Sequence, residues 1–149
     1  EGMFANATTF NKDLSWNTSS VTTMYDMFNA ASAFDGNISQ WTTTEVTTMQ
    51  RMFRDASSFN QAIGNWDTAK VENMSNMFYG ASTFNADIGS WTTTSVTNMR
   101  MMFHNASVFN QDISGWTVSS VTDCFDFSRT SALASESVPT FSSCDVTSP

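Results

Sequence analysis

The feature that most constrains the fold is a period of 25 residues that runs through most of the chain. The five tryptophans keep this step, and so do rows of Val, Met, Phe, Ala and Ile; the tryptophans are Trp16, Trp41, Trp66, Trp91 and Trp116. One such unit cannot bury its apolar face alone, so neighbouring units stack and share a continuous core. The period therefore predicts stacked coils in which each position meets its own copy above and below.

Three rows of large apolar residues are expected to form the centre of this core. They are Trp41, Trp66 and Trp91; Met49, Met74 and Met99; and Phe53, Phe78 and Phe103. Aromatic pairs of this kind contribute roughly 0.5–1.5 kcal/mol beyond burial. A Met and Phe stripe is also compatible with a ligand groove, but its recurrence in every repeat favours core packing.

Two different periodicities occur inside a typical copy, residues 91–115. Met99, Met102, Phe103 and Ala106 fall at i, i+3, i+4 and i+7, which is the apolar pattern of a short helix. Inward and outward residues alternate from Phe109 to Trp116, which indicates a short strand. We therefore predict an α/β repeat with one short helix and one short strand in each coil.

The motifs that recur at fixed offsets resemble a known family. VTTM, VENM or VTNM precedes MF, and FN-x-x-I followed by Trp recurs, over about residues 3–127. This pattern resembles the BspA-like surface-protein repeats, and more closely the 25-residue repeats of mycoplasma surface lipoproteins. The resemblance implies a right-handed leucine-rich-repeat-like solenoid, a cell-surface or secreted location, and adhesion, with no catalytic motif. The chain departs from the lipoprotein members because it has no lipobox cysteine and is poor in Lys.

The repeat array is expected to span residues 1–127, with a C-terminal cap over residues 128–149. Solenoids need atypical ends to cover the last layer of the core. The two cysteines, Cys124 and Cys144, lie near this end, which favours a disulfide that staples the cap and an oxidising compartment; two free thiols are the alternative. The chain begins within a repeat (EGMFANA), so we expect a processed protein or a piece of a longer array.

Composition and motifs exclude several classes of function. The formal net charge of -8 argues against nucleic acid or anionic lipid as a partner. No apolar run reaches the ~18 residues that a transmembrane helix needs. His104 is the single histidine, and its equivalents Asn29, Arg54 and Tyr79 mark a variable exposed position. Neither a zinc-type cluster nor a Gly-rich phosphate loop occurs, so we expect no enzyme and no cofactor.

Polar rows on the expected sheet face are candidate binding residues. They are Asn60, Asn85 and Asn110 in one row and Asp87 and Asp112 beside it. One interpretation is that the amides bond along the stack; the other is a polar face that binds protein or glycan. Asp87 and Asp112 in adjacent coils also suggest a calcium site, since calcium takes oxygen ligands. No EF-hand pattern accompanies them.

Two further sets of residues suggest modification or a special surface. Five Asn-X-Ser/Thr sequons would accept glycans in a secreted eukaryotic protein, namely Asn6, Asn17, Asn37, Asn73 and Asn105. Rows of threonine recur as well: Thr18, Thr43, Thr68 and Thr93 form one, and Thr22, Thr47, Thr97 and Thr122 form another that Glu72 interrupts. Regular Thr rows suggest ice binding.

From these observations we expect an extracellular or cell-surface module for adhesion or recognition of protein or glycan. The first alternative is a structural subunit of a surface filament or wall layer, with self-association. The second alternative is ice binding through the Thr rows.

Overall fold

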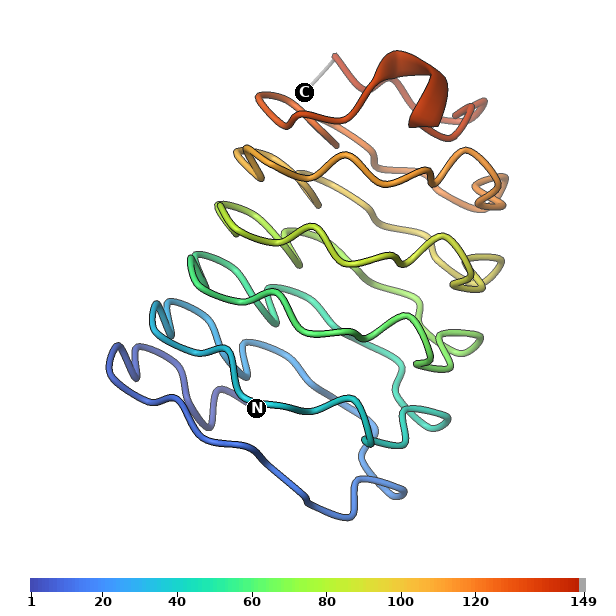
Figure 1. Cartoon of the computed structure of the whole chain (residues 1–149). Helices are drawn as coiled ribbons and strands as arrows, with labels where there is room; N and C mark the ends of the chain where they lie inside the picture. The colour runs from blue at the N-terminus through green and yellow to red at the C-terminus, as the bar shows by residue number, and fades with distance from the viewer. Residues whose placement is uncertain (148–149) are drawn as a thin grey trace.

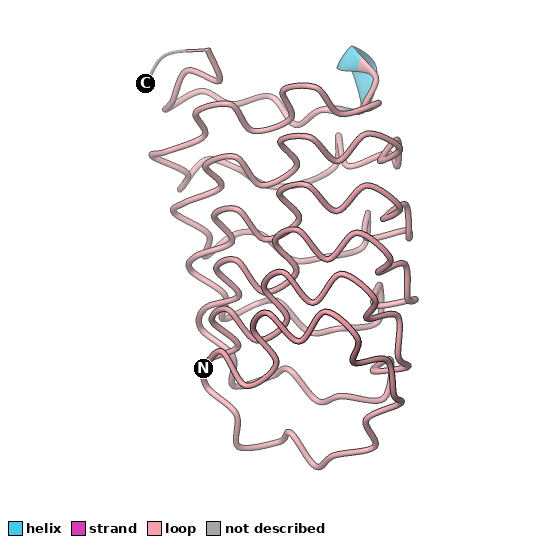
Figure 2. Cartoon of the chain, turned by 90° about the vertical axis from the view of Figure 1, so that its left-hand side faces the viewer, coloured by secondary structure: helices cyan, strands magenta, loops and turns pink. Residues whose placement is uncertain are grey.

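The computed structural model describes residues 1–147 as coils stacked in the order of the sequence (Figure 1). Viewed from the side, the coils lie in successive layers (Figure 2). Within the described residues the one helix is η1, a 3-10 helix over Ser135–Ser137. Its place is the C-terminal end of the stack (Figure 1).

The helix expected over Met99–Ala106 is absent, and its place is taken by consecutive turns. The backbone N–H of Met102 donates to the Met99 carbonyl at 3.2 Å, whereas that of Met101 donates to the Phe125 carbonyl of the next coil at 2.9 Å. Met101 has a φ of 51°, a left-handed conformation that an α-helix cannot contain. Backbone donors therefore alternate between a local turn and the neighbouring coil, so the prediction of a helix was wrong.

The strand expected over Phe109–Trp116 is also absent. The N–H of Asn110 donates to the side-chain oxygen of Asn85 at 3.0 Å, so an amide side chain stands where a sheet would place a backbone carbonyl. Among residues 1–147, parallel bridges between coils occur only as isolated pairs, which link Thr23, Thr48, Asn73, Asn98 and Asp123 in sequence. The expected α/β leucine-rich-repeat architecture, with a strand and a helix in each coil, was therefore wrong.

The core consists of like residues stacked on like residues. Phe78 lies 5.7 Å from Phe53 and 5.6 Å from Phe103, with nearly parallel rings, and 3.9 Å from Phe84 of its own coil. Residues at the three predicted rows are buried: Trp41, Trp66, Trp91, Met49, Met74, Met99, Phe53, Phe78 and Phe103. Offset parallel rings are a favourable geometry for aromatic pairs, so each layer packs on the one before.

The C-terminal segment closes the last layer of this core. The N–H of Asp126 donates to the Val146 carbonyl at 2.8 Å. In the preceding coil the equivalent N–H, that of Met101, bonds to the next coil, so the cap takes the place of a further coil here. The Phe127 ring lies at 86° to that of Phe103, and Phe141 packs on Phe127 at 68°, so the column of parallel rings ends here. Residues 148–149 of the expected cap lie outside the described residues.

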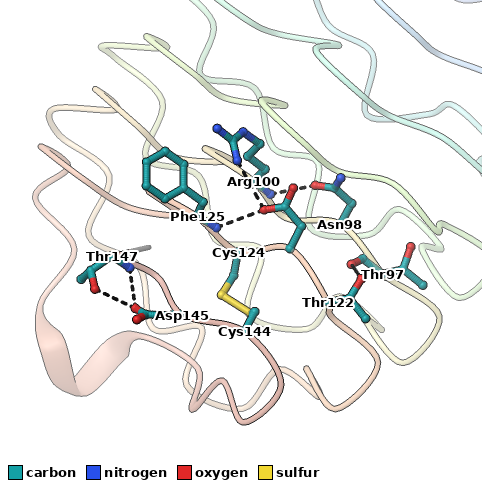
Figure 3. The surroundings of a disulfide bond; sticks show 10 residues. Thr97, Asn98, Arg100, Thr122, Cys124, Phe125, Cys144, Asp145 and Thr147 are labelled. Atoms are coloured by element: carbon teal, nitrogen blue, oxygen red, sulfur yellow. Dashed lines mark hydrogen bonds and ion pairs between the residues drawn. A yellow bond between two sulfur atoms is a disulfide. The ribbon is translucent and has the colours of Figure 1, made fainter. Parts of the chain in front are cut away.

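The predicted disulfide between Cys124 and Cys144 is confirmed. It joins Cα atoms 5.8 Å apart and closes a sequence separation of 20 residues (Figure 3). Cys124 occupies the buried position that Met holds in the preceding coils. The bond therefore fastens the cap directly to the core.

At the opposite end, the first layer keeps part of its apolar surface in contact with solvent. Phe4 stacks on Phe28 at 5.4 Å and Trp16 on Trp41 at 6.2 Å, yet Trp16 and Met3 are exposed. Within residues 1–147, no helix has the length and apolar character that crossing a membrane requires.

Candidate functional site

The asparagine row that sequence analysis proposed as a binding face forms bonds along the stack. The side-chain oxygen of Asn60 accepts the N–H of Asn85 at 2.8 Å, and that of Asn85 accepts the N–H of Asn110 at 3.0 Å. Asn110 continues the series to the N–H of Ala134 in the cap at 3.1 Å. These amides therefore hold neighbouring coils together, which is the first of the two interpretations considered for them.

Removing one of these amides is expected to destabilise the stack. Asn85→Ala deprives the Asn110 N–H and the Gln111 side chain of their shared acceptor, so the free energy of unfolding should fall by about 1 kcal/mol. Urea denaturation measures this change. Thr44→Ala, at an exposed site whose side chain has no hydrogen bond, is the control. An equal loss in both variants would show that the row does not stabilise the stack.

The two aspartates of the expected face cap turns in their own coils. Asp87 accepts the N–H of Gly89 at 2.9 Å, and Asp112 accepts the N–H and the hydroxyl of Ser114 at 3.0 and 2.7 Å. No group of three or more His, Cys, Asp or Glu side chains in residues 1–147 is placed to hold a metal ion. The calcium hypothesis thus has no ligand set in this part of the chain.

The turn at Asp112 gives a pH-dependent prediction. Hydrogen bonds from the Ser114 hydroxyl and then its N–H hold the pKa of Asp112 below its ordinary value of 3.8. A lowered carboxyl pKa adds stability above the unfolded value, and that stability is lost as pH falls through the folded pKa. In Ser114→Ala we expect the Asp112 pKa to move up, as followed by carboxyl NMR titration. Thr44→Ala, at an exposed threonine of another coil, is the control and should leave the Asp112 pKa unchanged.

All four members of the first threonine row lie in the core rather than on the surface. Thr18, Thr43, Thr68 and Thr93 are buried, and each hydroxyl donates to a backbone carbonyl of the next coil at 2.9–3.0 Å. Hydroxyls that are buried in this way have no contact with solvent, so this row offers no surface to ice. In the second row, Thr47, Thr97 and Thr122 are exposed and donate to the preceding coil.

Four of the five sequons lie at exposed asparagines, namely Asn6, Asn17, Asn37 and Asn105. Asn73 is half-buried, and its sequon partner Ser75 is buried. An enzyme that adds glycans would therefore reach the first four more readily than Asn73.

A different surface combines the residue types that usually make contacts with partners. It lies on the two successive turns that begin at the first Met of each repeat, or at Cys124 in the last one, at four positions whose residues differ from coil to coil. Most of these side chains are exposed or half-buried, while Ser75 and Asp126 are buried. We call it the variable stripe: Tyr25, Asp26, Asn29, Ala30; Gln50, Arg51, Arg54, Asp55; Ser75, Asn76, Tyr79, Gly80; Arg100, Met101, His104, Asn105; and Phe125, Asp126, Arg129, Thr130. Arg and Tyr are enriched at recognition surfaces.

A column of stacked planar groups crosses the variable stripe. The Arg54 guanidinium lies 4.9 Å from the centre of the Tyr79 ring, and this ring is parallel to that of His104 at 5.0 Å. His104 Nδ1 lies 3.6 Å from Asp126 Oδ2, which also pairs with Arg129 at 3.5 Å. Consecutive coils thus fix one another's side chains across the stripe.

A second contact of this kind lies at the start of the stripe. Arg51 stacks over Tyr25 at 4.8 Å, donates to the Tyr25 hydroxyl and pairs with Asp26 at 2.7 Å. Burial raises the pKa of the Asp26 carboxyl, while the hydrogen bond from Asn29 and the charge of Arg54 act against this rise. The Asp26 carboxylate, which is less exposed than the Arg51 guanidinium, holds that guanidinium in place through their ion pair.

The third contact lies beside the disulfide. Arg100 stacks over the Phe125 ring at 4.5 Å (Figure 3). Its guanidinium also lies 3.8 Å from the Asp123 carboxylate. Arg guanidinium groups that stack on aromatic rings keep their N–H donors directed outward in the plane of the group. The stripe therefore presents prearranged donors at several levels of the stack.

Of this stripe, the sequence indicated only one position as variable and exposed, the position that holds His104. The signal for the rest was present in the differences among the repeats. The Phe beside that position recurs at Phe28, Phe53, Phe78 and Phe103, whereas the position itself changes identity in almost every coil. Positions that vary between otherwise equal copies are ones whose identity the repeated core does not determine.

Comparisons with known proteins give one kind of match. A protein family described as "Mycoplasma protein of unknown function, DUF285" matches residues 1–68 and again residues 59–137. No curated protein and no solved structure gave a match. The two matched segments together include every coil that carries the repeated tryptophan, so the family pattern extends over the array.

Proposed function

Since the chain belongs to the family described as "Mycoplasma protein of unknown function, DUF285", we propose that it is a non-catalytic adhesion or recognition module of the cell surface or extracellular space, with the variable stripe as its binding surface. Its partner is a protein or a glycan. The finer kinship with BspA-like surface repeats is part of this proposal and rests on the VTNM and FN-x-x-I motifs.

One observation carries the proposal. The core positions repeat with little change, while the outward turn positions combine Arg, Tyr, His and Asp differently in each coil. Repeat proteins commonly bind through an extended surface formed by equivalent positions of successive units. The side chains of the stripe are also held in place by stacking, so binding them costs little side-chain entropy.

The disulfide supports the proposed location. Disulfides persist in secreted and surface proteins and are rare in reducing compartments. The Cys124–Cys144 bond fastens the cap to the buried core, so it has a structural place in the fold. An extracellular or cell-surface location is consistent with such a bond.

The experiment is a binding screen against immobilised glycans and surface proteins, run with a matched pair of variants. Tyr79→Ala/His104→Ala removes the stacked pair of the stripe, and Thr44→Ala/Thr94→Ala alters exposed residues elsewhere. We expect the stripe variant to lose the binding that the native chain shows and the control to retain it, with melting temperatures recorded for both. Binding that both variants retain would place recognition outside the stripe.

A structural role in a surface filament or wall layer is the second candidate. The side chains of Trp16 and Met3 favour it, because both are exposed and exposed apolar groups promote association. Sedimentation velocity over a wide concentration range tests it. Growth into long species, abolished by Trp16→Asp, would support assembly, whereas a constant monomer would contradict it.

A further inference from the structure

We infer that the variable stripe binds an anionic polysaccharide, an extended glycan that carries carboxylate or sulfate groups; this inference rests on the proposed function. The first support is the distribution of cations. The chain has a net charge of -8 and six Lys and Arg residues. Four of these, Arg51, Arg54, Arg100 and Arg129, lie in the stripe together with the single histidine. The basic residues outside it are Lys12 and Lys70.

The second support is the depth of the charged groups. The side chains of Asp26 and Asp126 are 16% and 11% exposed, whereas those of their partners Arg51 and Arg129 are 29% and 66% exposed. The other two Arg–Asp pairs do not share this arrangement, since Asp55 is more exposed than Arg54 and Asp123 is as exposed as Arg100. At Arg51 and Arg129 the carboxylate therefore lies deeper than the guanidinium, and the outer layer there presents N–H donors to a ligand.

The third support is the geometry of those donors. A guanidinium is a planar fork that matches the spacing of two carboxylate or sulfate oxygens. Arg51, Arg54 and Arg100 each lie within 5 Å of an aromatic ring centre, at 4.8, 4.9 and 4.5 Å. Stacking restricts these side chains before a ligand arrives, so an anion meets donors that are already oriented.

A glycan fits this surface better than an acidic peptide does. A peptide that adds to a sheet edge needs free backbone groups, but the N–H groups of Met101, Phe103 and Asn105 donate to the next coil at 2.9, 2.7 and 3.0 Å. Protein partners also rely on apolar anchors, and the exposed large apolar side chains of residues 1–147 lie outside the stripe. Cations spread over three of the five layers of the stripe suit a polymer with repeated anions, where weak contacts add up.

The test compares polymers that differ only in charge or in backbone. Immobilised dextran sulfate is the probe, neutral dextran is its matched control, and polyglutamate supplies anions on a peptide. The native chain is compared with Arg54→Gln/Arg129→Gln and with Lys12→Gln/Lys70→Gln, which remove the same charge from different surfaces. We expect the native chain to bind dextran sulfate alone, the arginine variant to bind about tenfold more weakly or worse, and the lysine variant to match the native chain.

Each other outcome overturns the inference in a recognisable way. Equal weakening in both variants would indicate attraction to overall charge rather than to the stripe. Binding of dextran as tightly as dextran sulfate would indicate a neutral glycan, and binding of polyglutamate would indicate an acidic protein. In these last two cases the proposed function survives if Tyr79→Ala/His104→Ala abolishes binding, and fails if it does not. Absence of dextran sulfate binding overturns the inference alone, since the separate screen tests the function.

Discussion

Phe78→Ala is expected to lower the free energy of unfolding by about 3–5 kcal/mol. The Phe78 ring is fully buried and contacts rings on three sides, in its own coil and in both neighbouring coils. A cavity at this point cannot close easily, because the backbone of each coil is hydrogen-bonded to the coils on either side, as the N–H of Phe78 is to the Met102 carbonyl at 2.9 Å.

Urea denaturation followed by far-UV circular dichroism measures this loss. Val108→Ala serves as the control, because Val108 is an exposed apolar residue of the next coil and should change stability by less than about 0.5 kcal/mol. Phe78→Leu should fall between the two, since it retains much of the volume. A loss for Phe78→Ala as small as that for Val108→Ala would contradict the stacked core.

Loss of the disulfide is expected to lower the free energy of unfolding by about 3 kcal/mol, the value for a closed loop of this length. The bond closes a separation of 20 residues and holds the cap over the final layer. Cys124→Ser/Cys144→Ser should therefore melt at a lower temperature than the native chain, as measured by calorimetry.

Reduction provides the matched comparison for this double variant. A reducing agent should destabilise the native chain by a similar amount and leave the double variant unchanged. Reduction without any change in melting temperature would show that the bond contributes nothing to the cap.

The sequence identified which residues point inward but not the backbone that carries them. The spacing of Met99, Met102, Phe103 and Ala106 is satisfied by a helix and equally by consecutive turns, because both return a side chain to the same face after three or four residues. Gly80 has a φ of 66°, and a glycine at this position of the repeat indicates a left-handed turn that a helix cannot contain. Its equivalents, among them Asp55 and Ala30, adopt the same left-handed conformation without a glycine to indicate it.

The candidate sites were predictable to a different extent. The cysteine pair was found because both cysteines lie at the end of the array, where the repeat no longer holds. The asparagine row was recognised, but its role was left open, since hydrogen bonding along the stack and exposure to a ligand require the same residue type. The variable stripe was missed because the repeat is recognised from the apolar residues that its copies share. A binding surface of this kind consists instead of positions at which the copies differ.

The like-on-like core has a consequence for how such a gene can change. Since the stacked rings of adjacent layers join equivalent positions and the remaining ring contacts lie within a coil, duplicating or deleting one whole 25-residue unit recreates the same contacts at the new junction. Unequal recombination can thus lengthen or shorten the protein without disturbing its packing. Each inserted unit would also bring four fresh outward positions, so the reach of the molecule and the combination of side chains it displays can evolve in a single genetic event.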